Sequence, residues 1–219
     1  MAKLVRKDLN QDFRPLIYST FEKYKCSNYY SYFGSYLFND KYALLSLSEL
    51  NRNKFLYYGI FGKEALLFIR PDSGEKTFQA QLLDLLDFDR FYKDNQHLKH
   101  DLILISSPKD IKWEGRIVVS KHKEIIAHST YRFQGQITKI PAIPEDATEL
   151  VKELLNINYY PDSVFCYDIC QGADDKFYLL ELTSFSSAGL YECNKEQIVR
   201  KVSEIAWEDY ERATAAKNG

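Results

Sequence analysis

Two acidic residues stand out in the last third of the chain, because each lies inside a run of apolar residues. Asp168 lies in SVFCYDIC, and Glu181 lies in YLLELTS. A buried carboxylate is costly unless it is paired with a positive group or bound to a cation. The segment between the two runs, QGADDK, contains glycine and aspartate and predicts the turn of a hairpin. These two acids are therefore the first candidates for chemistry.

The register of this hairpin decides whether the two acids meet. If the turn centres on residues 173–174, Asp168 and Glu181 share one face and lie at most about 7–8 Å apart. Thr183 lies on the same face as Glu181, because side chains alternate along a strand. Two carboxylates on one face favour a hard cation such as Mg²⁺. The alternative is a pair of strand-end carboxylates that water solvates.

Cations gather at a second predicted hairpin, in residues 64–83. ALLFI indicates a buried strand that ends at Arg70 and Pro71, DSGEK indicates a turn, and TFQAQL alternates like a second strand. Arg70 and Lys76 then lie at the mouth of the hairpin, where two cations can hold phosphate through charge-assisted hydrogen bonds. The alternative is a solvated hairpin end with incidental charges.

The elements that must position these residues are a mixture of strands and helices. DLILISSP indicates a buried strand, and WEGRIVV and EIIAHSTYRF indicate two strands around the turn SKHK, with Glu114 and Arg116 on one face. Apolar spacing predicts helices from about Asp84 to residue 96, over 145–157 and over 194–217, the last capped by Asn194. Ser46 or Ser48 with Glu49 predicts the start of a further short helix.

Composition narrows the class of protein. The chain has 219 residues, 45% of them hydrophobic, which is enough for one large domain or two lobes. Its net charge of −2 argues against a general affinity for nucleic acid. The tyrosine-rich block SNYYSYFGSYLF is interpreted as core, because a stacking platform for single strands would need a basic groove.

The cysteines and the N-terminus bear on the compartment. The four cysteines form no CxxC pair and the four histidines have no metal-ligand spacing, which predicts free thiols. MAKLVRKDLNQDF has no apolar stretch typical of a signal peptide, and no run approaches the ~18 apolar residues of a membrane span. The expectation is a soluble, cytoplasmic protein without a membrane partner. The sequence predicts no particular oligomeric state.

Four pieces in order resemble the ATP-grasp superfamily: FIRPDSGEKTF, LISSPKDIKWEGRIVV, SVFCYDIC and LLELTSFSSAGLY. The similarity spans about Leu66 to Tyr191. It is greatest to a clade of small proteins, often phage-encoded, with an arginine and lysines in the first lobe. The resemblance implies an α+β fold in which two lobes with antiparallel sheets clasp ATP. It assigns 1–60 to a short N-terminal region, 61–107 to the first lobe with its linking strand, and 108–219 to the second lobe.

The resemblance also implies roles for individual residues. Arg70 and Lys76 match phosphate-binding positions of the first lobe, and LILISS, with Ile103, Ile105 and Ser106, matches the adenine-binding strand.

In the second lobe, Glu114 and Arg116 match an E-x-R element that binds the nucleotide, and Arg116 would neutralise phosphate or acyl-phosphate charge. Arg132 matches a basic position that faces phosphate or substrate.

Asp168 and Glu181 match the two carboxylates that bind Mg²⁺. Thr183 stands where the family commonly has asparagine, and the resemblance implies that its oxygen is a third ligand of Mg²⁺ or of a water on it. The loop Ser184–Gly189 could approach phosphates or the acceptor through backbone N–H groups; the alternative is a plain connecting loop.

The implied activity is ATP- and Mg²⁺-dependent joining of a carboxylate to an amine through an acyl phosphate. The substrate would be a peptide or protein terminus or a small amino compound. Two alternatives stay open at this point. One is phosphoryl transfer without ligation. The other is a nucleotide- or partner-binding protein with weakened catalysis, for which the short region 1–60 and Thr183 both argue.

Overall fold

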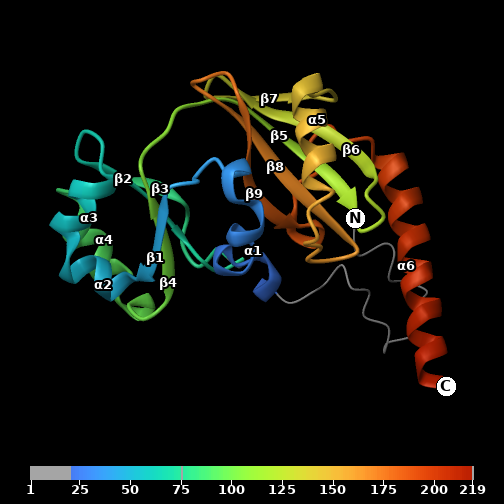
Figure 1. The fold of residues 1–219 in the computed structure, drawn as a ribbon, viewed down its shortest axis with the longest axis horizontal. Helices are drawn as coiled ribbons and strands as arrows, with labels where there is room; N and C mark the ends of the chain where they lie inside the picture. Colours follow the sequence, from blue (N-terminus) through green and yellow to red (C-terminus); the bar gives the residue numbers. More distant parts are fainter. Residues whose placement is uncertain (1–20, 75, 219) are drawn as a thin grey trace. The chain divides into compact units, whose positions relative to one another are not determined.

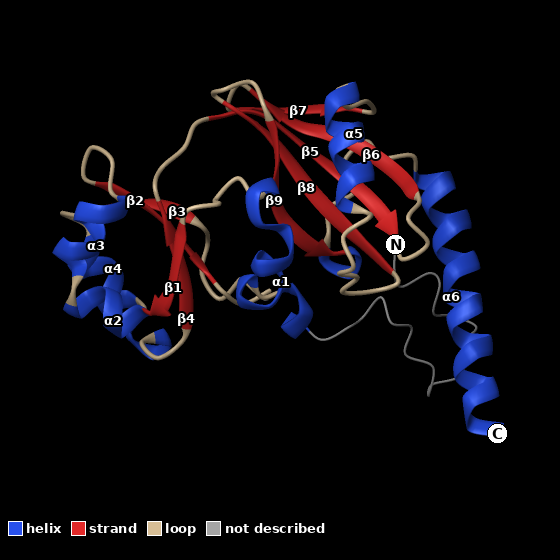
Figure 2. Cartoon of the chain, in the orientation of Figure 1, coloured by secondary structure: helices blue, strands red, loops and turns tan. Residues whose placement is uncertain are grey.

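The computed structural model describes residues 21–74 and 76–218, and the expectation about a signal peptide at the N-terminus lies outside them. Contacts divide the described chain into two compact units, one of residues 21–110 and one that contains residues 111–218. Residues 21–60 thus belong to the same unit as the predicted first lobe. The predicted α+β class is confirmed, since each unit combines helices with an antiparallel sheet (Figure 2).

The unit of residues 21–110 is built on a four-stranded sheet in the order β1-β4-β2-β3. Its strands are β1 (Tyr42–Ser46), β2 (Leu66–Pro71), β3 (Gln81–Asp84) and β4 (Leu102–Ser106). Its helices are α1 (Cys26–Phe33), α2 (Leu47–Arg52), α3 (Lys54–Phe61) and α4 (Phe88–Asp94), with short 3-10 turns at Phe21–Tyr24, Gly34–Tyr36 and Gln96–Leu98.

One face of this sheet carries the apolar core of its unit. Side chains of α2, α3 and α4 pack against alternate residues of the strands, among them Leu67, Ile69, Ile103 and Ile105. Ser46 caps α2, as its sequence pattern predicts, because its hydroxyl accepts a hydrogen bond from the backbone N–H of Glu49 at 3.2 Å.

The tyrosine-rich block forms core, as the sequence predicts. Tyr29, Tyr30 and Phe33 of α1 are almost wholly buried. Tyr29 and Tyr30 meet edge to face with their ring centroids 5.0 Å apart, and Tyr30 meets Tyr42 in the same way at 4.8 Å. These rings are therefore not available as a stacking platform for bases.

Two boundaries in this unit differ from the sequence prediction. Residues 77–80 lie outside the strands, and the partner of β2 begins at Gln81. The helix predicted from Asp84 begins at Phe88 instead, since Asp84 still pairs with Leu66 and its carboxylate then accepts a hydrogen bond from the N–H of Leu86 at 2.8 Å. This hydrogen bond from the backbone to the Asp84 side chain stabilises a turn, which the helical spacing of apolar residues does not reveal.

The second unit is built on a five-stranded sheet in the order β7-β6-β5-β8-β9 (Figure 1). Its strands are β5 (Ile111–Ser120), β6 (Ile125–Phe133), β7 (Gln136–Ile140), β8 (Val164–Gly172) and β9 (Phe177–Ser184). Its helices are α5 (Glu145–Leu154) and α6 (Lys195–Asn218), with a 3-10 turn at Phe185–Ser187. The two predicted hairpins of this unit are confirmed.

The helices of this unit cover opposite faces of the sheet. Tyr167 of β8 donates a hydrogen bond to the carbonyl of Leu154 in α5, whereas its neighbour Cys166 packs with Ile198 and Val202 of α6. Because successive strand residues point to opposite faces, α5 and α6 lie on different sides. Asn194 caps α6 as predicted, accepting a hydrogen bond from the N–H of Gln197 at 3.0 Å.

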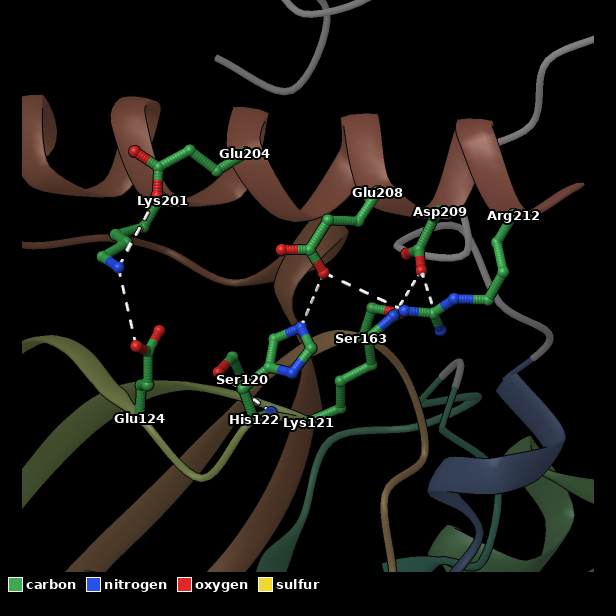
Figure 3. A network of polar contacts seen from close by, with 10 residues as sticks. All are labelled: Ser120, Lys121, His122, Glu124, Ser163, Lys201, Glu204, Glu208, Asp209 and Arg212. Atoms are coloured by element: carbon green, nitrogen blue, oxygen red, sulfur yellow. Dashed lines mark hydrogen bonds and ion pairs between the residues drawn. The ribbon is translucent and has the colours of Figure 1, made fainter. Parts of the chain in front are cut away.

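Charged side chains tie α6 to the turn between β5 and β6 (Figure 3). Lys121 pairs with Asp209 and donates to the hydroxyl of Ser163 at 3.1 Å, while His122 contacts Glu208 at 2.9 Å. Lys201 adds an ion pair with Glu124 at 3.5 Å, also drawn in Figure 3. The network fixes α6 over one end of the sheet, where its apolar side chains pack against Val118 and Cys166.

Candidate functional site

The two acids of the β8–β9 hairpin lie directly opposite each other. Asp168 pairs with Glu181, and a bulge follows immediately, because Ile169 pairs with Leu179. Thr183 lies on the same face, and its hydroxyl is 3.1 Å from Oδ2 of Asp168 and 3.3 Å from Oε1 of Glu181. The prediction that these three residues share a face is confirmed, with a closer pairing than the diagonal one allowed by the sequence.

Asp168 is bonded to the arginine that faces it on the next strand. Nε and Nη2 of Arg116 each donate to one carboxylate oxygen of Asp168, both at 2.7 Å. The pair is almost wholly buried, and such a two-bond guanidinium–carboxylate pair is strong and directional. Burial by itself would lower the pKa of Arg116, but the charge of Asp168 outweighs it, so that the pKa is raised. Arg116 is therefore always positively charged.

Glu114 lies two residues before Arg116 on the same face and holds a second group of side chains. The hydroxyl of Tyr131 donates to its Oε2 at 2.8 Å, and Nη1 of Arg132 lies 3.3 Å from its Oε1. Two adjacent residues of β6 reach one carboxylate because a bulge interrupts the strand: Glu114 pairs with Arg132 and Gly115 with Thr130, which leaves Tyr131 as the extra residue.

Tyr131 was not found by sequence reasoning, although it lies next to Arg132. Burial first, and then the charges of Asp168 and Glu114, raise its pKa, so that the hydroxyl stays protonated and donates. A simple alternation of inward and outward residues assigns Tyr131 and Arg132 to opposite faces. The only sequence signal was the polar-aromatic cluster STYRF, whose bulge no spacing rule predicts.

Tyr191 is the second aromatic residue that the sequence did not reveal. Its ring stacks on that of Tyr131, with centroids 4.8 Å apart and planes 17° apart. The guanidinium of Arg116 lies 5.3 Å from the Tyr191 centroid and 5.9 Å from that of Tyr131. The carbonyl of Gly189 accepts a hydrogen bond from Nη1 of Arg116 at 2.9 Å. The loop predicted to offer N–H groups thus offers a carbonyl here, to an arginine.

The predicted nucleotide residues of the other unit lie on its four-stranded sheet. Arg70 is a buried residue near the end of β2, directly after the last pair with β3, and Lys76 lies in the following loop with an exposed side chain and a φ of 54°. Arg70 pairs with Leu104, and Phe68 with Ser106, so Arg70 and Ser106 share one face. These residues belong to a different compact unit from the cluster around Asp168.

Ile103 and Ile105 point to the other face, into the apolar core. The backbone of Ile105 pairs with Ala43 on one side and Ile69 on the other, so its strand is central. The hydroxyl of Ser106 donates to Oδ1 of Asn39 at 3.0 Å in a buried position. The side chain of Ile105 is packed in the apolar core, so the adenine contact expected of this strand stays a prediction for its backbone.

Larger clusters of metal-ligating side chains do not occur in the described residues. No group of three or more His, Cys, Asp or Glu side chains suited to a metal ion occurs in residues 21–74 and 76–218. All four cysteines lie in this range and are free and buried, as predicted. Two carboxylates and a hydroxyl are oxygen ligands only, and this set suits Mg²⁺, which commonly takes one or two carboxylates and completes its shell with water and phosphate.

A separate cavity of about 520 Å³ lies in the same unit and contains none of the predicted site residues. It is lined by residues of β6, by Pro141 and by residues around the start of α6. The residues of the Arg116–Asp168 network do not line this hollow. In the described part of the chain, no helix is both long and apolar enough to cross a membrane.

Three solved structures share the fold. An ATP-grasp ligase, PsnB, complexed with a minimal precursor, is 15% identical, with a TM-score of 0.50 over 77% of this chain and 54% of that one. The D-cycloserine synthetase DcsG is 11% identical, with a TM-score of 0.53 over 76% and 64%. The macrocyclase MdnC bound with precursor peptide MdnA, from Microcystis aeruginosa MRC, is 15% identical, with a TM-score of 0.51 over 76% and 54%.

This chain spans between about half and two thirds of the length of those proteins. No curated protein matches the sequence. A sequence model of a family does match, over residues 49–201, and it describes an ATP-grasp domain, family 2 of the R-2-K clade. The match covers well over half of the chain and extends over parts of both units, so the protein belongs to this second family of the clade, within the ATP-grasp superfamily.

Proposed function

We propose that the protein is an ATP- and Mg²⁺-dependent ligase that joins a carboxylate to an amine through an acyl phosphate. The observation that carries the proposal is the convergence of Asp168, Glu181 and Thr183 on one sheet face of an ATP-grasp protein. Such oxygen ligands fit Mg²⁺, which when bound would offset phosphate charge and align the transferred group.

The residues of the second unit would do the following work. Asp168, Glu181 and Thr183 would hold the metal through their side-chain oxygens, and the Thr183 hydroxyl would also orient the carboxylates. Arg116 and Arg132 stabilise the negative charge that develops on the phosphoryl and acyl-phosphate groups. Glu114 holds Arg132 through an ion pair and Tyr131, whose ring lies beside Arg116, through a hydrogen bond. Glu114 also matches a nucleotide-binding position.

The residues of the first unit would bind ATP itself. Arg70 and Lys76 supply positive charge to the phosphates. Arg70 is buried and fixed by its strand, whereas Lys76 lies beyond the strand with an exposed side chain. Ser106 and the backbone near Ile105 serve the adenine. No protein nucleophile is required, because the amine substrate attacks the acyl phosphate directly.

The similar structures suggest the class of substrate. Two of the three are complexes with a precursor or a precursor peptide, and the third is a D-cycloserine synthetase. A peptide or protein carboxylate joined to an amine is the proposed chemistry, with a small amino acid derivative as the other choice. About half of the Arg132 side chain is exposed, which supports a contact with such a substrate.

A protein with weakened catalysis, which binds nucleotide or a partner, is the second candidate, and one observation favours it. Both oxygens of Asp168 already accept hydrogen bonds from Arg116, and one of them also accepts the Thr183 hydroxyl. A metal ion would have to share or displace the arginine. Phosphoryl transfer without ligation would use the same residues and differ only in the acceptor.

Turnover of ATP to ADP and phosphate, with and without peptide or amino acid acceptors, tests the ligase. Asp168→Asn should lower Mg²⁺-dependent turnover about 100-fold, while metal-free nucleotide binding changes little. Asp175→Asn is the matched control, since Asp175 lies in the turn of the same hairpin and pairs with Lys112 at the surface. Nucleotide binding without turnover in any acceptor mixture would favour the second candidate. An equal loss of turnover and of metal-free binding in Asp168→Asn would contradict the metal role.

A further inference from the structure

The guanidinium of Arg116 is held from several directions at once. Asp168 takes two of its N–H groups, the carbonyl of Gly189 takes a third, and the rings of Tyr131 and Tyr191 lie at 5.9 and 5.3 Å from it. A guanidinium near an aromatic face is attracted by the negative charge of the π system, and more so when water is excluded. Two of these contacts come from the segment 189–191, which lies outside the helices and strands.

Tyr191 has an unusual backbone conformation for this contact. Its φ is 48°, in the left-handed region, which is unfavourable for a residue with a bulky side chain. Strain of this kind persists only where the surroundings hold the residue, and it occurs often at functional sites. Here the stacking on Tyr131 and the closeness to Arg116 are the contacts that the strained conformation makes possible.

The segment that carries Tyr191 is fixed on both sides. The N–H of Glu192 donates to the hydroxyl of Ser129 at 3.3 Å, and the N–H of Cys193 to the carbonyl of Leu190 at 2.9 Å. Cys193 is buried in the apolar core under α6. Ser129 pairs with Arg116 across the sheet, so the segment and the arginine share one rigid support.

We propose that Tyr191 is a positioning residue whose ring, together with the carbonyl of Gly189, holds the guanidinium of Arg116 on Asp168. The inference rests on the proposed metal role of Asp168. It adds that the aromatic support of Arg116 determines how readily a cation gains access to that carboxylate. A guanidinium and a metal ion compete for the same oxygens, so loosening the first strengthens the binding of the second.

Because of this competition, the direction in which the Mn²⁺ affinity changes distinguishes a positioning role of Tyr191 from simple structural support. In the full chain, Tyr191→Leu should tighten the binding of Mn²⁺ about threefold to tenfold, because about 1 kcal/mol of attraction on Arg116 is lost. Mn²⁺ binding is measured from the loss of the free ion's electron paramagnetic resonance signal. Arg116→Gln should tighten binding at least as much. A residue that merely supports the fold would weaken metal binding when it is truncated.

Two variants control for the loss of a ring. Tyr191→Phe keeps the aromatic face and should bind Mn²⁺ within about twofold of the wild type. Tyr160→Leu removes a ring from the same unit that contacts Phe165 and should also leave the affinity unchanged. Weaker or unchanged Mn²⁺ binding in Tyr191→Leu, with Asp168-dependent binding in the wild type, overturns the inference.

Failure of the proposed metal role would be recognised separately. If Mn²⁺ binding is absent in the wild type or unaffected by Asp168→Asn, the metal role fails, and the positioning role is decided by a thermal double-mutant cycle. Tyr191→Leu should lower the unfolding midpoint by about 2 °C less in an Arg116→Gln background than in the wild type. Equal lowering in both backgrounds shows that ring and guanidinium do not interact and overturns the inference.

Discussion

One face of the five-stranded sheet has two ends with opposite surroundings. On β5, Arg116 and Val118 are two residues apart and point the same way, as do Cys166 and Asp168 on β8. Val118 and Cys166 lie under α6 in an apolar core, whereas Arg116 and Asp168 lie in a network of charges and aromatic rings. Along each of these strands, a shift of two residues on the same face thus leads from a packing surface to a candidate active site.

The difference teaches where this fold can keep buried charge. At the α6 end, side chains gain stability by removing apolar surface from water. At the other end, Arg116 pairs with Asp168 and Arg132 with Glu114, each on a neighbouring strand, and the register of three strands sets these pairs. Buried pairs of this kind contribute little net stability compared with apolar side chains of the same size, although breaking one is costly.

The largest expected effect breaks the polar end. Arg116→Met leaves the carboxylate of Asp168 buried without its partner and should lower the free energy of unfolding by about 3–5 kcal/mol, measured in urea. Arg116→Met combined with Asp168→Leu removes both charges and should restore stability to within about 1 kcal/mol of the wild type. A double variant as unstable as the single one would mean that the polar end holds the fold through more than charge pairing.

A variant at the apolar end should lower stability without changing the affinity for Mn²⁺. Ile198→Ala removes a buried side chain of α6 and should lower the free energy of unfolding by about 2–4 kcal/mol, with Mn²⁺ affinity of the folded protein unchanged. Val199→Ala, one residue along the helix with its side chain exposed, should stay within about 0.5 kcal/mol. A change in Mn²⁺ affinity in Ile198→Ala would show that the two ends are coupled.

The smallest expected effect is a change of stability with pH that depends on Cys193, which lies between the apolar and the polar end. Burial raises the pKa of the Cys193 thiol to about 11, although the charge of Arg116 opposes the rise. The unfolded thiol ionises at a lower pH, so this contribution to stability is complete below about pH 8.5 and is lost as the pH rises toward 11. The loss should be at most about 1.4 kcal/mol for each pH unit within that interval.

Chemical denaturation at about pH 8, 9.5 and 10.5 measures this loss. In Cys193→Ala the free energy of unfolding should fall less steeply with pH over that interval than in the wild type, whatever the stability of the variant at the lowest pH. Cys26→Ala serves as the control, since Cys26 is a buried thiol of the other unit. Parallel declines in Cys193→Ala and wild type would assign the alkaline loss to other groups.

Much of the fold could be predicted from local patterns. Ser46 and Asn194 cap helices because their side chains satisfy backbone N–H groups a few residues away. The β8–β9 hairpin follows from two apolar runs around a glycine–aspartate turn. The predicted start of α4 was wrong because a side chain shortly before it, that of Asp84, stabilises a turn inside a segment with helical spacing.

The candidate site could be predicted in part. The types Asp168, Glu181 and Thr183 and their shared face follow from alternation, which is a property of any strand. Ile105 shows the limit, since an apolar residue of a central strand looks the same in sequence whether it faces core or ligand, and here it faces core.

The sequence by itself determined most of the strands, though not β1 or β7, together with two helix caps and the acidic hairpin, because these depend on neighbours along the chain. Only the tertiary structure decided that Arg116 lies on Asp168, that a bulge turns Tyr131 toward Glu114, and that Tyr191 lies beside the guanidinium. Most of these contacts join residues far apart in the chain. Their geometry depends on bulges, on pairing between strands and on a left-handed backbone residue, and none of these leaves a periodic signal in the sequence.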